Sequence, residues 1–248
     1  MKFLTSLFLA FLSISICNAQ DNYDVDLIPA ELKNRANAVV RNQEAVVDMQ
    51  APNNVIYTVK HAITILNKNG EENARLVLFY DKNTSIKSIK GEVYNEVGKL
   101  IKKITQNDFS DESAVNGFSL FEDNRVKHHL PLVNIYPYTV VYNYEIRFKQ
   151  NLMIPEWAPK SSSDISVEKS SYTFICKPSD KFRIKTENIN FKPAESNNEK
   201  QKTIVWKLVN LTSTKVEPYS PNKTTYLPSI KIAPENFTYY NYKGSYIN

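Results

Sequence analysis

The segment from residue 136 to residue 149 constrains the fold of this chain more than any other part of the sequence. Apolar side chains occupy every second position there: Tyr136, Tyr138, Val140, Tyr142, Tyr144, Ile146 and Phe148. Polar residues, among them Thr139, Glu145 and Arg147, alternate with them. Such alternation is typical of a strand buried on one face, whereas a helix would spread the apolar side chains around its surface. The pattern predicts a central strand with its even-numbered face in the core and its other face much less buried.

Two hairpins are predicted upstream of this strand. The alternating segment 57–65 is followed by Asn67-Lys68-Asn69-Gly70, which predicts a tight turn because Asn and Gly both tolerate a positive φ. The return strand of this first hairpin is expected over residues 74–80. The second hairpin is expected over residues 86–104, with its turn at Asn95-Glu96-Val97-Gly98.

The remaining patterns complete the fold class. Further strands are predicted over residues 165–176, 182–191, 203–211 and 226–232. One helix is predicted over Ala30–Ala38, where Pro29 suits the first turn. Strands at hairpin spacing without helices between them indicate an all-β fold, namely an antiparallel β-sandwich with one short N-terminal helix. With 42% apolar and 12% aromatic residues, the chain can form its core without disulfides or metals.

The N-terminus reads as a secretory signal peptide over residues 1–19. Lys2 is followed by an uncharged apolar run to Cys17, and small residues precede the expected cleavage site after Ala19. Export to the periplasm or cell surface follows, with no transmembrane span after cleavage, because the run is shorter than a bilayer requires. An uncleaved anchor and lipid attachment at Cys17 are the alternatives, although Ile16 stands where lipid attachment favours a small residue.

Residues 20–248 are predicted to form a single domain, whose Pro- and Tyr-rich stretch 212–248 supplies terminal strands and the start of a linker. The net charge of +5 over 248 residues gives no basis for a nucleic-acid partner. The chain has only five glycines and neither of the glycine-rich phosphate-binding motifs. No cofactor is therefore predicted.

The thiol and the imidazoles give no catalytic arrangement. Signal cleavage leaves Cys176 as the one cysteine, and His61, His128 and His129 all precede it. Papain-like enzymes place the histidine after the cysteine, so Cys176 is interpreted as a buried structural thiol and no catalytic residue is assigned. His61 lies on the apolar face of its strand and is interpreted as a hydrogen-bonded core histidine rather than a base.

No metal site is predicted either. His128 and His129 are adjacent in a predicted strand, so their side chains point to opposite faces. The acidic stretch 21–26 lacks the Gly and Glu positions of a calcium loop. The carboxylates Asp108, Asp111 and Glu112 form either a solvated loop or a pair of the kind that glycosidases use.

Trp157 is the one candidate ligand contact. It lies between Pro155 and Pro159, directly after the longest predicted strand. A tryptophan held in this way either fills the open end of the sandwich or forms a rigid platform on which a sugar or peptide stacks.

Several segments together resemble a known family: Tyr23-Asp24-Val25 with the stretch Pro29–Val40, Lys90-Gly91-Glu92-Val93-Tyr94 with Gly98-Lys99-Leu100, Leu120-Phe121-Glu122-Asp123-Asn124-Arg125-Val126, Tyr136-Pro137-Tyr138-Thr139-Val140 and Ala233-Pro234-Glu235-Asn236-Phe237. This family is the N-terminal domain of unknown function found ahead of transglutaminase-like cysteine protease modules in secreted bacterial proteins. The resemblance implies a non-catalytic accessory or binding module whose partner is a downstream transglutaminase-like module. The given chain is then expected to be either a fragment that lacks this module or a stand-alone copy. A module that binds a peptide or glycan polymer of the envelope is the alternative, and a cryptic hydrolase is a third class.

Overall fold

A large mixed sheet organises the computed structural model, which describes residues 22–114, 123–215, 219 and 226–246. The predicted signal peptide lies outside these residues. Eight strands form the sheet, in the spatial order β11 (Ala194–Asn197), β12 (Lys202–Leu211), β9 (Ile165–Cys176), β1 (Ala38–Ala51), β2 (Asn54–Ile65), β8 (Tyr138–Phe148), β4 (Thr84–Tyr94) and β5 (Leu100–Ile104). The pairing of β1 with β9 is parallel, while the other neighbours in this sheet are antiparallel.

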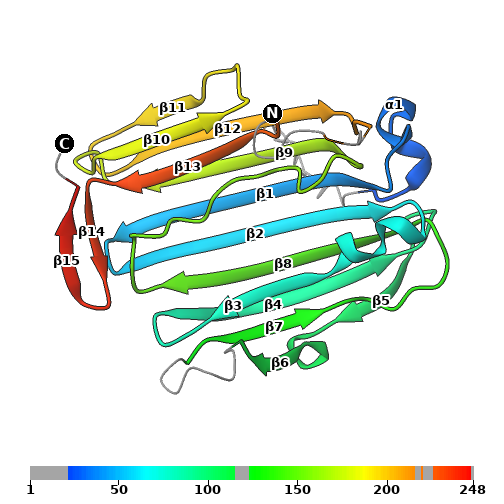
Figure 1. Ribbon diagram of the computed structural model, residues 1–248, viewed down its shortest axis with the longest axis horizontal. Helices are drawn as coiled ribbons and strands as arrows, with labels where there is room; N and C mark the ends of the chain where they lie inside the picture. The colour runs from blue at the N-terminus through cyan, green and yellow to red at the C-terminus, as the bar shows by residue number, and fades with distance from the viewer. Residues whose placement is uncertain (1–21, 115–122, 216–218, 220–225, 247–248) are drawn as a thin grey trace, which may run out of the picture.

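Three small sheets accompany the large one. They pair β3 (Leu76–Tyr80) with β7 (Arg125–His129) and β6 (Ser110–Ser113), β10 (Phe182–Glu187) with β13 (Ser229–Pro234), and β14 (Asn236–Tyr239) with β15 (Tyr242–Ser245). The β3-β7-β6 and β10-β13 sheets lie in front of the large sheet (Figure 1). The segment 149–164 passes between them and pairs with β13 through a bridge between Trp157 and Ile230.

These layers confirm the all-β sandwich. One core cluster packs β3 against β2, β4 and β8, and includes Leu78, Ile63 and Tyr142. A second packs β13 against β1, β9 and β12, and includes Ile230, Val47 and Trp206. Both clusters lie on one face of the large sheet, so the second layer of the sandwich consists of two separate small sheets.

The central strand has the predicted register. β8 lies between β2 and β4, and its even-numbered residues Tyr138 and Tyr142 are buried. The expectation for its other face is wrong at one end, because Thr139 is fully buried and its hydroxyl lies 2.7 Å from that of Thr64. Tyr23 from the N-terminal segment covers this end of the outer face, in a cluster with Val141.

The two predicted hairpins have different outcomes. The second is confirmed as the antiparallel pair β4 and β5, and Gly98 in its turn has a φ of 76°. The first is wrong: η2 (Lys68–Ala74), a 3-10 helix, follows β2, and β3 pairs with β7 instead of β2. Gly70 is needed there for close packing, because a Cβ at this position would lie 2.2 Å from the carbonyl oxygen of Asn37.

The N-terminal helix is shorter than predicted, and a long strand follows it. α1 spans only Ala30–Lys33, because Arg35 adopts a left-handed φ of 58°. Strand β1 begins at Ala38 and was not predicted. Its pairing with β2 slips by one residue between Val40 and Asn42, so its apolar positions change parity within the strand.

The other predicted strands are present as β9, β10, β12 and β13. Two further 3-10 turns are η1 (Val25–Leu27) and η3 (Gln106–Asp108). Among the described residues, no helix has the length and apolar character that crossing a bilayer requires.

Candidate functional site

A row of polar side chains crosses the otherwise apolar inner face of the large sheet. Strand register places Ser170 of β9 beside Gln43 of β1, Gln43 beside His61 of β2, and His61 beside Tyr142 of β8. Three of these side chains carry polar groups in positions that an alternating strand normally fills with apolar residues. The row marks the boundary between the two core clusters.

Gln43, His61 and Tyr142 of this row form the floor of a cavity of about 290 Å³. One wall comes from η2 and β3, with Glu72, Asn73 and Arg75, and the other from Ala158 and Ser161 of the crossing segment. Glu72, Arg75, Ala158 and Ser161 are exposed, so the cavity opens to solvent between them. The irregular turn that replaces the predicted hairpin therefore supplies one wall of the site.

A chain of hydrogen bonds fixes the orientation of Gln43. The indole Nε1–H of Trp157 donates to Ser170 Oγ at 2.9 Å, and the Ser170 hydroxyl donates to Gln43 Oε1 at 2.7 Å. An indole can only donate, so Ser170 accepts from Trp157 and uses its own proton in the bond to the Gln43 oxygen, which faces Ser170. The amide nitrogen of Gln43 is thereby directed away from Ser170, along the row.

Trp157 is not the exposed platform considered above. Only 1% of its surface is exposed, and its ring stacks on Tyr172 with a centroid distance of 6.3 Å. A ligand therefore finds no free face of the indole in this structure, and Trp157 fills the core as in the alternative interpretation. Its contact with the site runs through Ser170.

His61 is on the inner face of the sheet, as predicted, but it is not hydrogen-bonded to any residue that the structure describes. Part of the ring faces the cavity. Burial lowers its pKa to about 4, so the imidazole is neutral at pH 7, with one nitrogen as donor and the other as acceptor.

The full charges that the described residues place on the cavity wall neutralise each other. Arg75 donates from Nε to Glu72 at 2.9 Å and from one terminal nitrogen at 3.1 Å, which gives a forked ion pair. The remaining lining is largely apolar, with Val40, Ile63 and Ile165 beside the polar row.

A second hollow of about 610 Å³ lies further along the same face of the sheet. Its lining includes Tyr57, Phe79, Phe148 and Met153. Tyr57 and Tyr144 stand between the two spaces, with ring centroids 6.3 Å apart and a hydrogen bond between their side chains. The two hollows lie along the boundary between the β3-β7-β6 sheet and the crossing segment.

Cys176 is buried, as predicted, and lies in the core cluster beneath β13. Burial raises the pKa of its thiol to about 11, so the thiolate is scarce at neutral pH.

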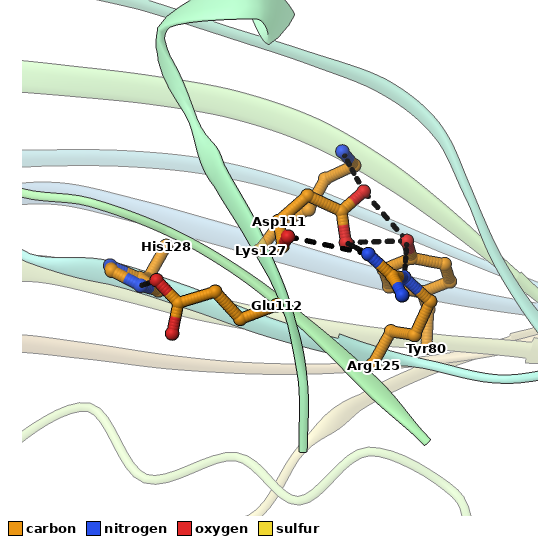
Figure 2. A network of polar contacts seen from close by, with 6 residues as sticks. All are labelled: Tyr80, Asp111, Glu112, Arg125, Lys127 and His128. Atoms are coloured by element: carbon orange, nitrogen blue, oxygen red, sulfur yellow. Dashed lines mark hydrogen bonds and ion pairs between the residues drawn. The ribbon is translucent and has the colours of Figure 1, made fainter. Parts of the chain in front are cut away.

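Of the carboxylates considered for a glycosidase pair, Asp108 ends η3, whereas Asp111 and Glu112 lie on β6. Asp111 is surrounded by donors (Figure 2). Lys127 Nζ donates to it at 2.6 Å, the Tyr80 hydroxyl at 2.8 Å and Arg125 Nε at 2.9 Å. The hydrogen bonds from Lys127 and Tyr80 lower the pKa of Asp111 to about 2. Asp111 is therefore the centre of a cross-strand ionic cluster, held on β6 rather than in a loop.

The two adjacent histidines make separate contacts. His128 lies 3.3 Å from Glu112, and His129 Nδ1 lies 2.8 Å from the carbonyl oxygen of Asp108. In the described part of the chain, no three His, Cys, Asp or Glu side chains converge in a way that could hold a metal ion.

Sequence reasoning found His61 but missed Gln43, Ser170 and the Arg75–Glu72 pair. Ser170 carried a partial signal, because it is polar and in phase with the apolar Tyr172 and Phe174 of a predicted strand, although Val167 is out of phase with it. Gln43 carried none, since the one-residue slip in β1 hides which face it occupies.

Two solved structures were compared with this fold. A candidate protease from Parabacteroides distasonis has a similar fold, with a TM-score of 0.66 and 12% identity over 81% of this chain and 41% of that one. An M1 zinc metallopeptidase from Deinococcus radiodurans aligns with a TM-score of only 0.35 and 10% identity, over 79% of this chain and 42% of that one. This chain thus spans less than half the length of either protein.

No curated protein sequence matches the chain significantly. The sequence profile of DUF3857, described as a domain of unknown function with a solved structure, matches residues 51–215, and the chain belongs to this family.

Proposed function

We propose that this chain is a non-catalytic accessory domain that binds peptide for a transglutaminase-like peptidase module of an exported bacterial protein. Membership of DUF3857 and the resemblance described above support the association of this domain with a transglutaminase-like module. The fold likeness to a candidate protease supports it too, because the likeness covers 41% of that protein and leaves most of it for other modules. Export to the periplasm or cell surface rests on the composition of residues 1–19.

The state of the reactive side chains supports a non-catalytic role. A nucleophilic cysteine requires a base within hydrogen-bonding reach and a lowered pKa. Cys176 is instead buried among apolar residues with a raised pKa. Asp111 is saturated by Lys127, Tyr80 and Arg125, so it is not available as a general acid.

The cavity carries the binding part of the proposal. Its floor presents the amide nitrogen of Gln43 and the ring of His61, and neither group has a hydrogen-bond partner among the described residues. Unpaired polar groups in a half-buried site are costly unless water or a ligand satisfies them. A cavity that combines apolar side chains, such as Val40, Ile63 and Ile165, with a few convergent polar groups is typical of binding sites.

Binding is tested with unfolded, carboxymethylated casein as the peptide probe and chitohexaose as the glycan probe. Ala158 is exposed at the cavity mouth, so Ala158→Trp should block the cavity without disturbing the core. Ala194→Trp, on the exposed edge strand β11, is the matched control. We expect casein binding that Ala158→Trp weakens at least tenfold and Ala194→Trp leaves unchanged. Binding of chitohexaose alone would favour the glycan-binding alternative.

Catalysis is tested on casein and on peptidoglycan with the wild-type chain and Cys176→Ala. We expect no turnover by either protein and slow alkylation of the native thiol by iodoacetamide. Turnover that disappears in Cys176→Ala would contradict the accessory role and support the cryptic hydrolase. The pairing with a transglutaminase-like module is tested separately, by reading the coding sequence beyond the codon for Asn248.

A further inference from the structure

We propose that the cavity floor selects an uncharged side-chain carboxamide, that of a glutamine or asparagine in a bound peptide. This inference rests on the proposed peptide-binding function and names the group that the cavity recognises. It follows from the hydrogen-bonding groups of Gln43, His61 and Tyr142 at the cavity floor. The charges of Glu72 and Arg75 at the cavity mouth support it.

The orientation of Gln43 is set by its neighbours and not by the ligand. Ser170 accepts from Trp157 and donates to the Gln43 oxygen, which holds that oxygen toward Ser170. The two N–H groups of Gln43 are therefore the part that the row offers to the cavity. A ligand beside Gln43 must supply an acceptor.

His61 supplies the complementary polarity. It is the direct neighbour of Gln43 across the β1–β2 pair, and its neutral ring has both a donor and an acceptor nitrogen. A carboxamide can place its oxygen toward the Gln43 N–H groups and its own N–H toward the acceptor nitrogen of His61. The Tyr142 hydroxyl does not donate to the ligand oxygen, because it already donates to the carbonyl oxygen of Ala74 at 3.1 Å.

Charge and size narrow the ligand further. The Glu72–Arg75 pair neutralises itself at the mouth, so a carboxylate or an ammonium group would lose its hydration without gaining a counter-charge. Val40, Ile63 and Ile165 offer apolar contact for the methylene groups that precede a carboxamide. The volume of about 290 Å³ lies at the small end of the roughly 300–1,000 Å³ usual for ligand pockets, so it suits one side chain.

The test is an NMR titration of the full chain with the pentapeptide AAQAA and its isosteric relatives AAEAA and AAMAA. We expect AAQAA to shift the side-chain amide signals of Gln43 and the ring signals of His61. Its Kd should be at least tenfold lower than those of the other two peptides. Chitobiose is titrated in parallel, because its acetamido groups carry the same chemistry on a sugar.

Variants of Gln43 and His61 test whether these residues cause the preference for AAQAA. Gln43→Glu replaces the N–H donors by an acceptor and should abolish the preference for AAQAA. His61→Phe, which keeps an aromatic ring, tests the same preference if Gln43→Glu fails to fold. Glu44→Gln is the matched control, because Glu44 is exposed and adjacent to Gln43 on β1.

The outcomes separate this inference from the proposed function. Equal affinities for the three peptides would overturn carboxamide selection and leave peptide binding intact. The absence of any shift with millimolar peptide would overturn both. Tighter binding of chitobiose than of AAQAA, at the same Gln43 and His61 signals, would assign the site to a sugar.

Discussion

The row at the cavity floor and the cluster around Asp111 both connect polar side chains across neighbouring strands, and they differ in how fully those side chains are satisfied. Around Asp111, the carboxylate accepts from Lys127, Tyr80 and Arg125 on an exposed surface. In the row, Gln43 and His61 are half-buried, and their free polar groups face a cavity. The first arrangement ties a small sheet together, whereas the second leaves room for a ligand. Polar side chains that lack protein partners therefore indicate a site better than charge does.

The largest expected effect is on the free energy of unfolding, and it is measured by truncating one tyrosine in each region. Tyr142→Ala should lower the free energy of unfolding by about 3–5 kcal/mol, the usual cost of truncating a large buried aromatic side chain. Tyr142 is 3% exposed, whereas Tyr80 is half-buried on the surface sheet. Tyr80→Ala should therefore cost clearly less. Urea denaturation of both variants measures this difference, and equal losses would contradict the assigned burial.

A smaller effect concerns the pH dependence of stability. Burial lowers the pKa of folded His61 to about 4, from an ordinary value of 6.5. Between these pH values the unfolded chain binds a proton that the folded chain does not, so stability falls as the pH decreases through this window. We expect His61 to account for a loss of about 1–3 kcal/mol.

This dependence is measured by denaturation of wild type and His61→Asn at pH 7 and pH 4.5. The variant should lose less stability on acidification than wild type. The same loss in both proteins would show that His61 titrates normally.

The smallest effect is expected at Asp111, whose pairs are exposed to solvent and salt. Asp111→Asn should reduce stability slightly at low ionic strength, and 1 M NaCl should remove most of the difference because it screens charges beyond about 3 Å. The pKa of Asp111 is lowered to about 2 from 3.8, so its contribution is present above pH 3.8 and is lost as the pH falls toward 2. Thermal unfolding in low and high salt checks this, with Glu44→Gln as the control. A difference that persists in 1 M NaCl would contradict a purely ionic role.

Local patterns predicted the strand that alternates most cleanly, β8, and the turn at Gly98. They failed where a residue serves a contact distant in the sequence. Gly70 reads as a turn residue, but its small size serves the close approach of Asn37. The hydrogen bond between Gln43 and Ser170 joins residues 127 positions apart, through a parallel strand pair that no local pattern indicates. The site could therefore be predicted only in part, through His61.

The slip in β1 has a further consequence. Arg41 is the extra residue at the slip, and it is held by Glu168 at 2.8 Å and by the carbonyl oxygen of Asp24 at 3.2 Å. In effect it inverts the phase of the strand: Ala38 and Val40 face inward before it, and Gln43, Ala45 and Val47 face inward after it. Deleting Arg41 would keep Gln43 opposite His61 on the inner face, because one residue would then separate Val40 from Gln43, as one residue separates Ile63 from His61 on β2. It would instead shift the second half of β1 by one residue relative to β9, so Gln43 would no longer lie beside Ser170. The extra residue therefore fits β1 to two neighbours of different spacing, because its pairing with β9 keeps one register on both sides of Arg41 while its pairing with β2 does not.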